Sequence, residues 1–334
     1  MRKRLRVLGK AAFLRVHTAM LGLGVIVLPK HYYAPVPDIR ELRRTRERWA
    51  RRSDMRGVDV DLDRQLAALR AMAGRFEPEY RSNAAFRHGT EGGFGPGFGF
   101  IEAQALHGVI RGARPSSIIE VGSGVSTHCM LNAVELNAAE GSPCSITCIE
   151  PHPSGWLNSA PVTLIPEPVQ TVGLGMFDSL AAGDLLFIDS THAVRTGGDV
   201  VHIVLSILPR LRPGVIVHFH DIYLPYDFQR DADHSLFQWM ETALLHAYLV
   251  DNARMGILFC LSQLHYDRPE ALREIFPEYR PEPHENGLRT EPPAGRHFPS
   301  SLYLQVQDPA GGPAFAGEAA SARQRDETVR EAAA

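Results

Sequence analysis

The chain has 334 residues, of which 44% are hydrophobic and 22% charged, so it can bury one full α/β core with additions. Its formal net charge of −3 excludes the marked basic excess of a nucleic-acid-binding surface, and we expect no nucleic-acid partner. The four cysteines include neither a Cys-x-x-Cys pair nor the Cys/His spacing of a zinc site, which favours a reducing, cytoplasmic compartment.

The N-terminal part is basic and partly apolar. Arginine and lysine crowd the first ten residues, and an apolar stretch follows at residues 11–28. Arg15 and His17 interrupt it, and the uncharged remainder, residues 18–29, is shorter than the roughly 20 residues of a membrane-spanning helix. We therefore expect residues 1–29 to form a helix that packs on the rest of the chain or makes a peripheral membrane contact.

Further appendages precede the main domain, which we place at residues 81–307. Prolines at residues 31–38 predict an extended connector, and residues 39–73 read as helices. Residues 1–80 are thus a basic, helical extension. Glycine and phenylalanine dominate residues 89–99, which suits a mobile loop lying across a ligand and equally suits a tight turn before the next helix.

From residue 100 onward, helical and apolar strand-like segments alternate. The segments are a helix at 100–112, a strand at 117–121, a helix at 126–138, strands at 145–149, 162–165 and 184–188, a helix at 198–211 and a strand at 214–220. Continuously apolar strands are typical of sheets covered on both faces. The alternation predicts a doubly wound, Rossmann-like α/β fold with a parallel sheet.

The C-terminal third continues this pattern and then loses it. We predict a helix at 237–249 carrying Trp239, strands at 255–262 and 300–306, a surface excursion rich in Pro, Glu and Arg at 267–298, and a disordered tail at 308–334.

The strongest local signal is the loop Glu120-Val-Gly-Ser-Gly-Val-Ser-Thr127, between the first strand and its helix. Glycines at such a junction let backbone amides approach a ligand at the helix N-terminus. A dinucleotide fingerprint would have a third glycine where Thr127 stands and an apolar residue where Glu120 stands. A carboxylate there disfavours pyrophosphate and favours a ligand bearing ammonium and sulfonium groups, which S-adenosylmethionine carries. The binding residues expected in this loop are Glu120, Gly122, Ser123, Gly124, Ser126 and Thr127.

A second carboxylate supports a nucleoside ligand without choosing between these donors. Glu150 ends the second strand, where an acid can accept both ribose hydroxyls. Trp156 follows and either shields an adenine or packs in the core. Gln170, after the third strand, is a candidate for the adenine edge.

Four ordered motifs resemble the class I S-adenosylmethionine-dependent methyltransferases, in particular a bacterial branch of small-molecule and sugar O-methyltransferase-like proteins. They are Glu120-Val-Gly-Ser-Gly, Ile149-Glu-Pro-His, Leu186-Phe-Ile-Asp-Ser-Thr-His192, and Leu211-Arg-Pro-Gly followed by His218-Phe-His-Asp221. The resemblance covers roughly residues 80–265 and the final strand, and the connector at 31–38 is also typical of that branch. It implies a seven-stranded sheet of order 3-2-1-4-5-7-6 with an antiparallel seventh strand.

The resemblance also implies a reaction centre at the ends of the fourth and fifth strands. Asp189 and Asp221 would orient the acceptor or hold a divalent metal such as magnesium, and His192 would act as base. His220 is a second candidate for the base. Ile222 stands where the metal-dependent relatives usually have asparagine, so one expected ligand is missing.

The loop after the fifth strand is where acceptors commonly bind in this fold class. Tyr223 and Tyr226 on it suit a sugar or phenolic hydroxyl and equally suit a packed loop. We therefore expect methyl transfer to a hydroxyl of a small molecule or glycan. An NAD-dependent oxidoreductase and a non-catalytic cofactor-binding scaffold at a membrane or assembly are the alternatives. The sequence carries no signal of oligomeric state.

Overall fold

The computed structural model describes residues 2–95, 97–292 and 294–308, so most of the tail expected to be disordered lies outside the described residues. Within the described part, two compact units are distinguished. The first runs to residue 46 and includes residues 233–236, and the second comprises the remainder. The boundary expected at residue 80 therefore falls inside the second unit.

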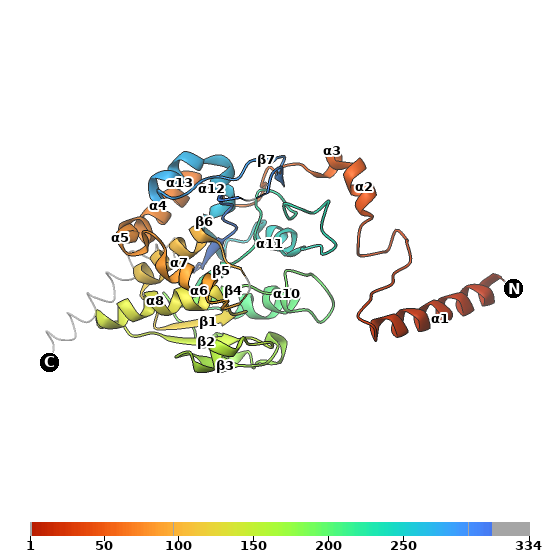
Figure 1. Cartoon of the computed structure of the whole chain (residues 1–334), viewed down its shortest axis with the longest axis horizontal. Coiled ribbons are helices and arrows are strands. Elements are labelled where there is room, and N and C mark those ends of the chain that lie inside the picture. The colour runs from red at the N-terminus through yellow and green to blue at the C-terminus, as the bar shows by residue number, and fades with distance from the viewer. Residues whose placement is uncertain (1, 96, 293, 309–334) are drawn as a thin grey trace. The chain divides into compact units, whose positions relative to one another are not determined.

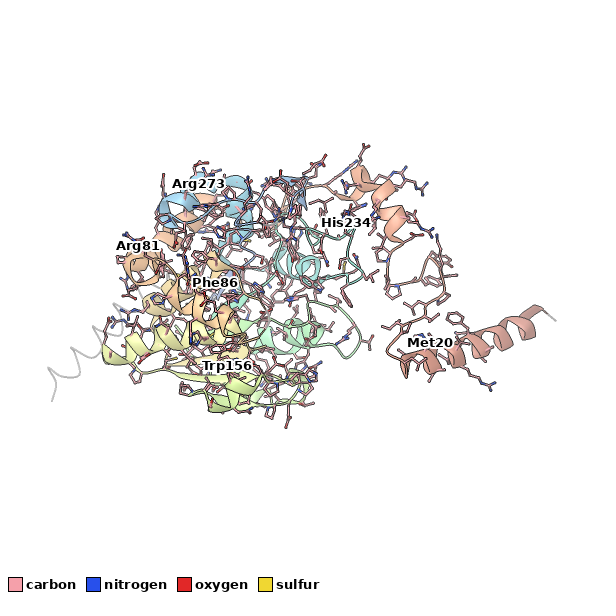
Figure 2. All side chains as sticks on the ribbon, viewed as in Figure 1. Met20, Arg81, Phe86, Trp156, His234 and Arg273 are labelled. Carbon is pink, nitrogen blue, oxygen red and sulfur yellow. The ribbon has the colours of Figure 1, made fainter. Side chains whose placement is uncertain are left out.

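The first unit contains α1 (Arg2–Leu21) and α2 (Ile39–Arg44). Asp38 caps α2 by accepting from the Arg40 amide, and its carboxylate also pairs with Lys30. Many apolar side chains of α1 and of the segment that follows it are exposed. Figure 2 labels Met20, which lies in the last turn of α1. Among the described residues, no helix combines the length and apolar character needed to cross a membrane.

The second unit begins with short helices, all but the first of which pack on the sheet domain. They are α3 (Arg46–Trp49), which starts at the unit boundary, α4 (Leu62–Met72), α5 (Glu77–Tyr80) and α6 (Ala84–Glu91). Asp61 begins α4 by accepting from the amides of Asp63 and Arg64. The apolar face of α4, which includes Leu69, is buried in the same core as the sheet.

A seven-stranded sheet forms the centre of this unit in the described residues, in the order β3-β2-β1-β4-β5-β9-β6, which confirms the predicted topology (Figure 1). The strands are β1 (Ser117–Val121), β2 (Ser145–Ile149), β3 (Thr163–Ile165), β4 (Leu185–Ile188), β5 (Ile216–Phe219), β6 (Met255–Cys260) and β9 (Leu302–Val306). Only β9 runs antiparallel to its neighbours among these strands, so the chain's last described strand is the predicted reversed one.

Helices cover both faces of the sheet. They are α7 (Phe100–Ala113), α8 (Val125–Ala139), α9 (Gly175–Asp178), α10 (Asp199–His202), α11 (Glu241–Leu249), α12 (Leu261–Asp267) and α13 (Pro269–Ile275). Successive residues of β1 point to opposite faces, so Ile118 packs with α7 and α8 whereas Ile119 packs with the helical segments on the other face. This double cover explains why the strands are apolar without alternation.

Three predicted elements differ in detail. The helix expected at 198–211 is broken, because α10 passes into a π-helical turn at Ile203–Ile207 and a 3₁₀ turn at Leu208–Arg210. Trp239 precedes α11 instead of lying on it. Residues 267–298 are more than a surface excursion, since they include α13 and the hairpin β7 (His284–Glu285) and β8 (Leu288–Arg289) and bury several side chains.

Candidate active site

The glycine bend after β1 is tied directly to the end of β4. Gly122 has a φ of 84°, and a Cβ added to it would lie 2.0 Å from the backbone oxygen of Asp189. The Asp189 amide donates to Val121 O at 2.9 Å, which holds the two strand ends together. Only glycine fits this close approach. The bend and the polar residues after β4 are therefore one structural unit.

Glu120 lies beneath the bend, and its carboxylate is fully buried. It accepts hydrogen bonds from Ser126 Oγ at 2.7 Å and Thr127 Oγ1 at 2.6 Å, and from Cys148 Sγ at 3.3 Å. Burial raises the pKa of Glu120 to about 7, although these three donors oppose the shift. Glu120, Ser126 and Thr127 thus shape the loop from below, and their direct contact with a ligand stays a prediction.

The buried Glu120 carboxylate predicts a pH dependence of stability. Its pKa rises from 4.5 to about 7 on folding, so the native state favours the protonated form. The stability that the native state gains by holding this proton is fully present below pH 4.5 and is lost as the pH rises through 7. The loss corresponds to about 3 kcal/mol of unfolding free energy. Glu120→Gln cannot ionise, so we expect chemical denaturation to show this variant gaining stability relative to the wild type between pH 5 and 7.5. Glu135→Gln, at an exposed position of α8, is the matched control. A stability difference between Glu120→Gln and wild type that is equal at both pH values would contradict the prediction.

Glu150 lies beside the same bend on the β2 side. Its carboxylate accepts from the Ser123 amide at 3.2 Å and from the His152 amide at 2.7 Å. The hydroxyl of Ser123 is buried and has no hydrogen-bond partner among the described residues. A buried hydroxyl without a partner is costly, so it marks a position where a ligand atom would be stabilised.

The glycine-rich segment passes over the bend. A Cβ added to Gly95 would lie 2.9 Å from the Cα of Gly124. Trp156 donates to Phe94 O at 2.7 Å, and the two rings stack with centroids 4.7 Å apart (Trp156 is labelled in Figure 2). The segment therefore contacts the bend itself, and its role as a mobile loop across a ligand stays a prediction.

Gln170 lies in a 3₁₀ turn after β3, and its side-chain amide donates to Gly197 O at 3.0 Å. This bond connects the loops that follow β3 and β4. Its predicted role at an adenine edge stays a prediction.

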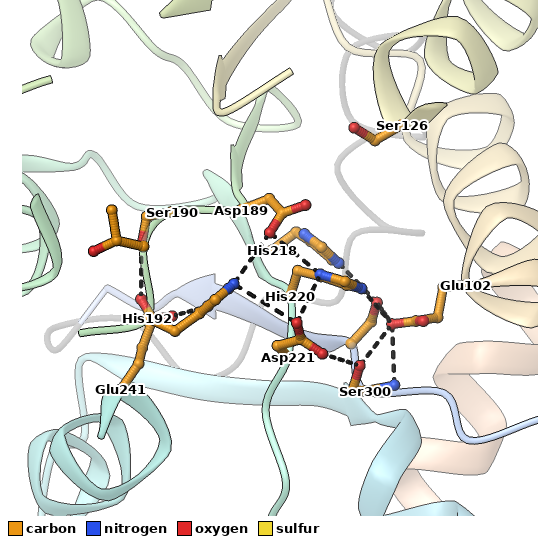
Figure 3. A network of polar contacts seen from close by, with 12 residues as sticks. Glu102, Ser126, Asp189, Ser190, His192, His218, His220, Asp221, Glu241 and Ser300 are labelled. Atoms are coloured by element: carbon orange, nitrogen blue, oxygen red, sulfur yellow. Dashed lines mark hydrogen bonds and ion pairs between the residues drawn. The ribbon is translucent and has the colours of Figure 1, made fainter. Parts of the chain in front are cut away.

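Four predicted residues converge where β4 and β5 end (Figure 3). Asp189 Oδ1 lies 3.3 Å from His220 Nδ1 and 3.4 Å from His192 Nε2, and Asp221 Oδ2 lies 3.6 Å from each of these nitrogens. His192 and Asp221 have φ values of 57° and 55°, which are uncommon for residues with a side chain. Such backbone conformations cluster at functional sites. We call these four residues the strand-end cluster.

Three side chains that the sequence did not single out complete the surroundings. Glu241, the first residue of α11, accepts from His192 Nδ1 at 2.8 Å. Glu102, in the first turn of α7, lies 3.4 Å from His220 Nε2. Ser300 donates to Asp221 Oδ1 at 3.0 Å and, through its amide, to Glu102 at 3.0 Å. Both glutamates are buried.

The carboxylates control the protonation of both imidazoles. Burial lowers the pKa of His192, but the hydrogen bonds to Asp189 and Glu241 outweigh it and raise the pKa to about 10. Burial likewise opposes the shift of His220, whose pKa is raised well above its usual value by Asp221 and Asp189. Despite burial, the two imidazoles hold the pKa of Asp189 well below its usual range. With carboxylates as their partners, both imidazoles hold their protons more tightly than a free histidine does, and their role as base stays a prediction.

The two predicted acceptor-binding tyrosines have different positions. Tyr223 is buried and donates to Asp221 Oδ1 at 3.2 Å, so it borders the strand-end cluster. Tyr226 packs against Tyr266, with ring centroids 4.9 Å apart, and its ring covers Gly287. The structure thus brings Tyr223, and not Tyr226, to the cluster.

Comparison with known proteins agrees with this architecture. Residues 119–222 match a family model described as a methyltransferase domain. An uncharacterised protein of Archaeoglobus fulgidus is 31% identical over 181 residues, which cover 47% of this chain and 75% of that protein. This chain belongs to the same family as that archaeal protein and carries a methyltransferase domain. The matched range contains the glycine bend, Glu150 and the strand-end cluster, whereas Glu102, Glu241 and Ser300 lie outside it.

Two solved structures are more distantly similar to the chain. The O-methyltransferase TomG of Streptomyces achromogenes, involved in tomaymycin synthesis and solved with S-adenosylmethionine, shares 14% identity at a TM-score of 0.39, over 75% of this chain and 92% of TomG. A Thermobifida fusca protein assigned as a methyltransferase shares 12% identity at a TM-score of 0.37, over 79% of this chain and 98% of its own.

Proposed function

We propose that the chain transfers the methyl group of S-adenosylmethionine to a hydroxyl of a small molecule or glycan. The observation that carries the proposal is the contact between Gly122 and Asp189, which joins the nucleoside-binding bend to the strand-end cluster. A donor on the bend would present its methyl group near these polar side chains. Positioning donor and acceptor in this way supplies a large part of the catalysis in such a displacement.

The bend fits the donor in three respects. Glu150 offers carboxylate oxygens for the ribose, the Ser123 hydroxyl has no partner among the described residues, and the glycine-rich segment crosses above. Trp156 lies on the same side of the bend, stacked on Phe94, where it would help to cover the nucleoside.

The strand-end cluster suits a hydroxyl acceptor because an attacking hydroxyl must lose its proton. As the oxygen bonds to the methyl carbon, the carbon–sulfur bond breaks and S-adenosylhomocysteine leaves, so the proton needs an acceptor in the site. His192 and His220 remain the predicted bases. Each imidazole must first lose its own proton, which the neighbouring carboxylates stabilise. A divalent cation held by Asp189 and Asp221 would displace that proton and favour deprotonation of the hydroxyl. The resemblance suggests magnesium for this position.

Calorimetry tests the donor. We expect the chain to bind S-adenosylhomocysteine and to show no measurable affinity for NAD. Glu150→Gln should weaken S-adenosylhomocysteine binding by at least roughly 10-fold, because a ribose then loses a charge-assisted acceptor. Glu135→Gln on α8 should bind as the wild type does. Binding of NAD in place of S-adenosylhomocysteine would favour the oxidoreductase alternative and refute the proposal.

Methyl transfer itself is tested with labelled donor. Incubation with methyl-labelled S-adenosylmethionine and fractionated small molecules and glycans should place the label on an oxygen of one fraction. Asp189→Asn should bind S-adenosylhomocysteine and fail to transfer the label. Equal transfer by this variant would exclude a catalytic role of the strand-end cluster and would leave the scaffold alternative.

A further inference from the structure

Three residues of the strand-end cluster offer ligand atoms that lie close together, and the fourth residue lies beside them (Figure 3). The three atoms are Asp189 Oδ1, His192 Nε2 and His220 Nδ1, and the neighbouring atom is Asp221 Oδ2. Ligand atoms of the first three all lie within 4.8 Å of one another. The separations that join the imidazole nitrogens to the two carboxylates range from 3.3 to 3.6 Å.

The separations that join Asp189 Oδ1 to the two imidazole nitrogens, 3.4 and 3.3 Å, match the shell of a small divalent ion. Two nitrogen or oxygen ligands that each lie about 2.1 Å from a tetrahedrally coordinated ion are separated by roughly 3.4 Å. Direct hydrogen bonds would bring the same atoms closer, to about 2.7–2.9 Å for a charged nitrogen and a carboxylate. Asp189 and the two imidazoles are therefore spaced more widely than their ion pairs require, at a separation that suits an ion between them.

Side chains around the strand-end cluster hold its ligand atoms so that they face one another. Metal-binding histidines almost always donate their other ring nitrogen to a carboxylate, a carbonyl or water. His192 turns Nδ1 to Glu241 at 2.8 Å, and His220 turns Nε2 toward Glu102 at 3.4 Å. Tyr223 and Ser300 donate to Oδ1 of Asp221, which leaves Oδ2 facing the imidazoles. Each imidazole thus has a carboxylate beside its outer nitrogen, as the histidines of metal sites usually do.

The ligand types decide the class of metal. Magnesium prefers oxygen ligands in octahedral geometry, whereas imidazole suits zinc, iron, nickel and copper. Ile222 is fully buried and supplies no further oxygen after Asp221. We infer that Asp189, His192 and His220, with Asp221 beside them, form a binding site for a divalent transition-metal ion of the zinc and iron type, in preference to magnesium. The side chains of Asp189 and Asp221 are each 21% exposed, which leaves an entry path and a position for an acceptor oxygen.

The inference rests on the proposed function only in placing the ion beside an acceptor, because its geometry does not involve the methyl donor. It changes the roles expected of His192 and His220. Both become ligands and would not act as the base, so the proton of the attacking hydroxyl would pass to the neighbouring, partly exposed Asp221 carboxylate.

Cobalt(II) is the probe, because its visible absorption reports coordination directly and requires no methyl acceptor. Full-length chain without an affinity tag is treated with a chelator, dialysed and titrated with Co²⁺. We expect one equivalent to bind, with a visible spectrum of low coordination number, and Zn²⁺ to displace it. Mg²⁺ at a 100-fold higher concentration should not displace it. Absence of a cobalt spectrum, or displacement by equimolar Mg²⁺, would overturn the inference.

Variants separate a built site from adventitious binding. His220→Gln should weaken Co²⁺ binding by at least 100-fold, and Glu241→Gln, which keeps every ligand, by about 10- to 100-fold. His246→Gln, a histidine on α11 that pairs with Asp227, is the matched control and should bind as the wild type does. If His220→Gln fails to fold, as circular dichroism would show, Glu241→Gln carries the test. Wild-type affinity in Glu241→Gln together with His220→Gln would overturn the inference.

S-adenosylhomocysteine is titrated into the same samples, so that the two proposals can fail independently. Co²⁺ binding without S-adenosylhomocysteine binding would refute the proposed function and support the metal site. S-adenosylhomocysteine binding without Co²⁺ binding would do the reverse.

Discussion

Gly122→Ala is expected to weaken S-adenosylhomocysteine binding and to slow methyl transfer by at least roughly 100-fold, since a misplacement of about 1 Å costs a reaction that much. The added methyl group would lie 2.0 Å from Asp189 O, and a backbone atom at the end of a central strand cannot yield as a flexible side chain can. Gly122 also has a φ of 84°, which costs an alanine about 1–2 kcal/mol. The bend must therefore open, and the Asp189 backbone must move with it.

The same substitution should lower the unfolding free energy by about 2–5 kcal/mol, from backbone strain and overpacking together. Gly173→Ala is the control, because its added Cβ meets nothing within 4 Å and its φ is not left-handed. Calorimetry with S-adenosylhomocysteine and thermal unfolding without ligand measure the two effects. Wild-type affinity in Gly122→Ala would mean that the bend does not hold the donor.

Sequence patterns predicted the sheet and its ligand-binding edge because both follow from local chemistry. The apolar runs that became β1, β2, β4 and β5 are continuous, as strands covered on both faces must be. Because parallel strands end at one edge of the sheet, the residues after them had to meet there, and Asp189 and Asp221 do so.

The buried glutamates were not predictable in the same way. Glu102 and Glu241 stand in the first turns of α7 and α11, where an acid stabilises a helix at the protein surface. Their inward orientation depends on how each helix crosses the sheet, and this information is not local. His192 and His220 were identified from strand-end positions, but the carboxylates that fix their protonation were not.

The charge argument at the glycine bend also changes once burial is known. From the sequence, Glu120 was expected to attract a cationic ligand. In the structure its carboxylate is covered by Ser126, Thr127 and Cys148, and burial raises its pKa to about 7, so it is a weak source of negative charge. Glu150, which contacts the Ser123 amide beside the bend, is the better placed carboxylate.

The excursion after α12 supports the cluster through a buried ion pair. Arg230 is 3% exposed, pairs with the buried Glu282 and donates to Pro283 O at 3.0 Å. Its guanidinium lies 4.1 Å from the centre of the Phe298 ring, which stacks on Tyr223. Tyr223 in turn donates to Asp221, so a continuous series of packed side chains joins this ion pair to the strand-end cluster.

Arg230→Met is therefore expected to destabilise the protein by about 3–5 kcal/mol, because it leaves the buried Glu282 carboxylate with Arg289, at 3.4 Å, as its one cationic partner among the described residues. For a domain of this size the melting temperature should fall by roughly 10 °C. Differential scanning calorimetry measures the loss. Adding Glu282→Gln to Arg230→Met should recover most of it, since the unpaired charge is then gone.

Arg273→Met provides the control, because Arg273 pairs with Glu270 on the exposed side of α13 (labelled in Figure 2) and such surface pairs contribute about 0–1 kcal/mol. Equal melting temperatures of Arg230→Met and Arg273→Met would show that the buried pair does not hold the excursion. If instead Arg230→Met is destabilised and also loses Co²⁺ affinity, the packed series of Arg230, Phe298 and Tyr223 positions Asp221 beside the metal site. Retained Co²⁺ affinity in the destabilised variant would confine the role of the pair to the fold.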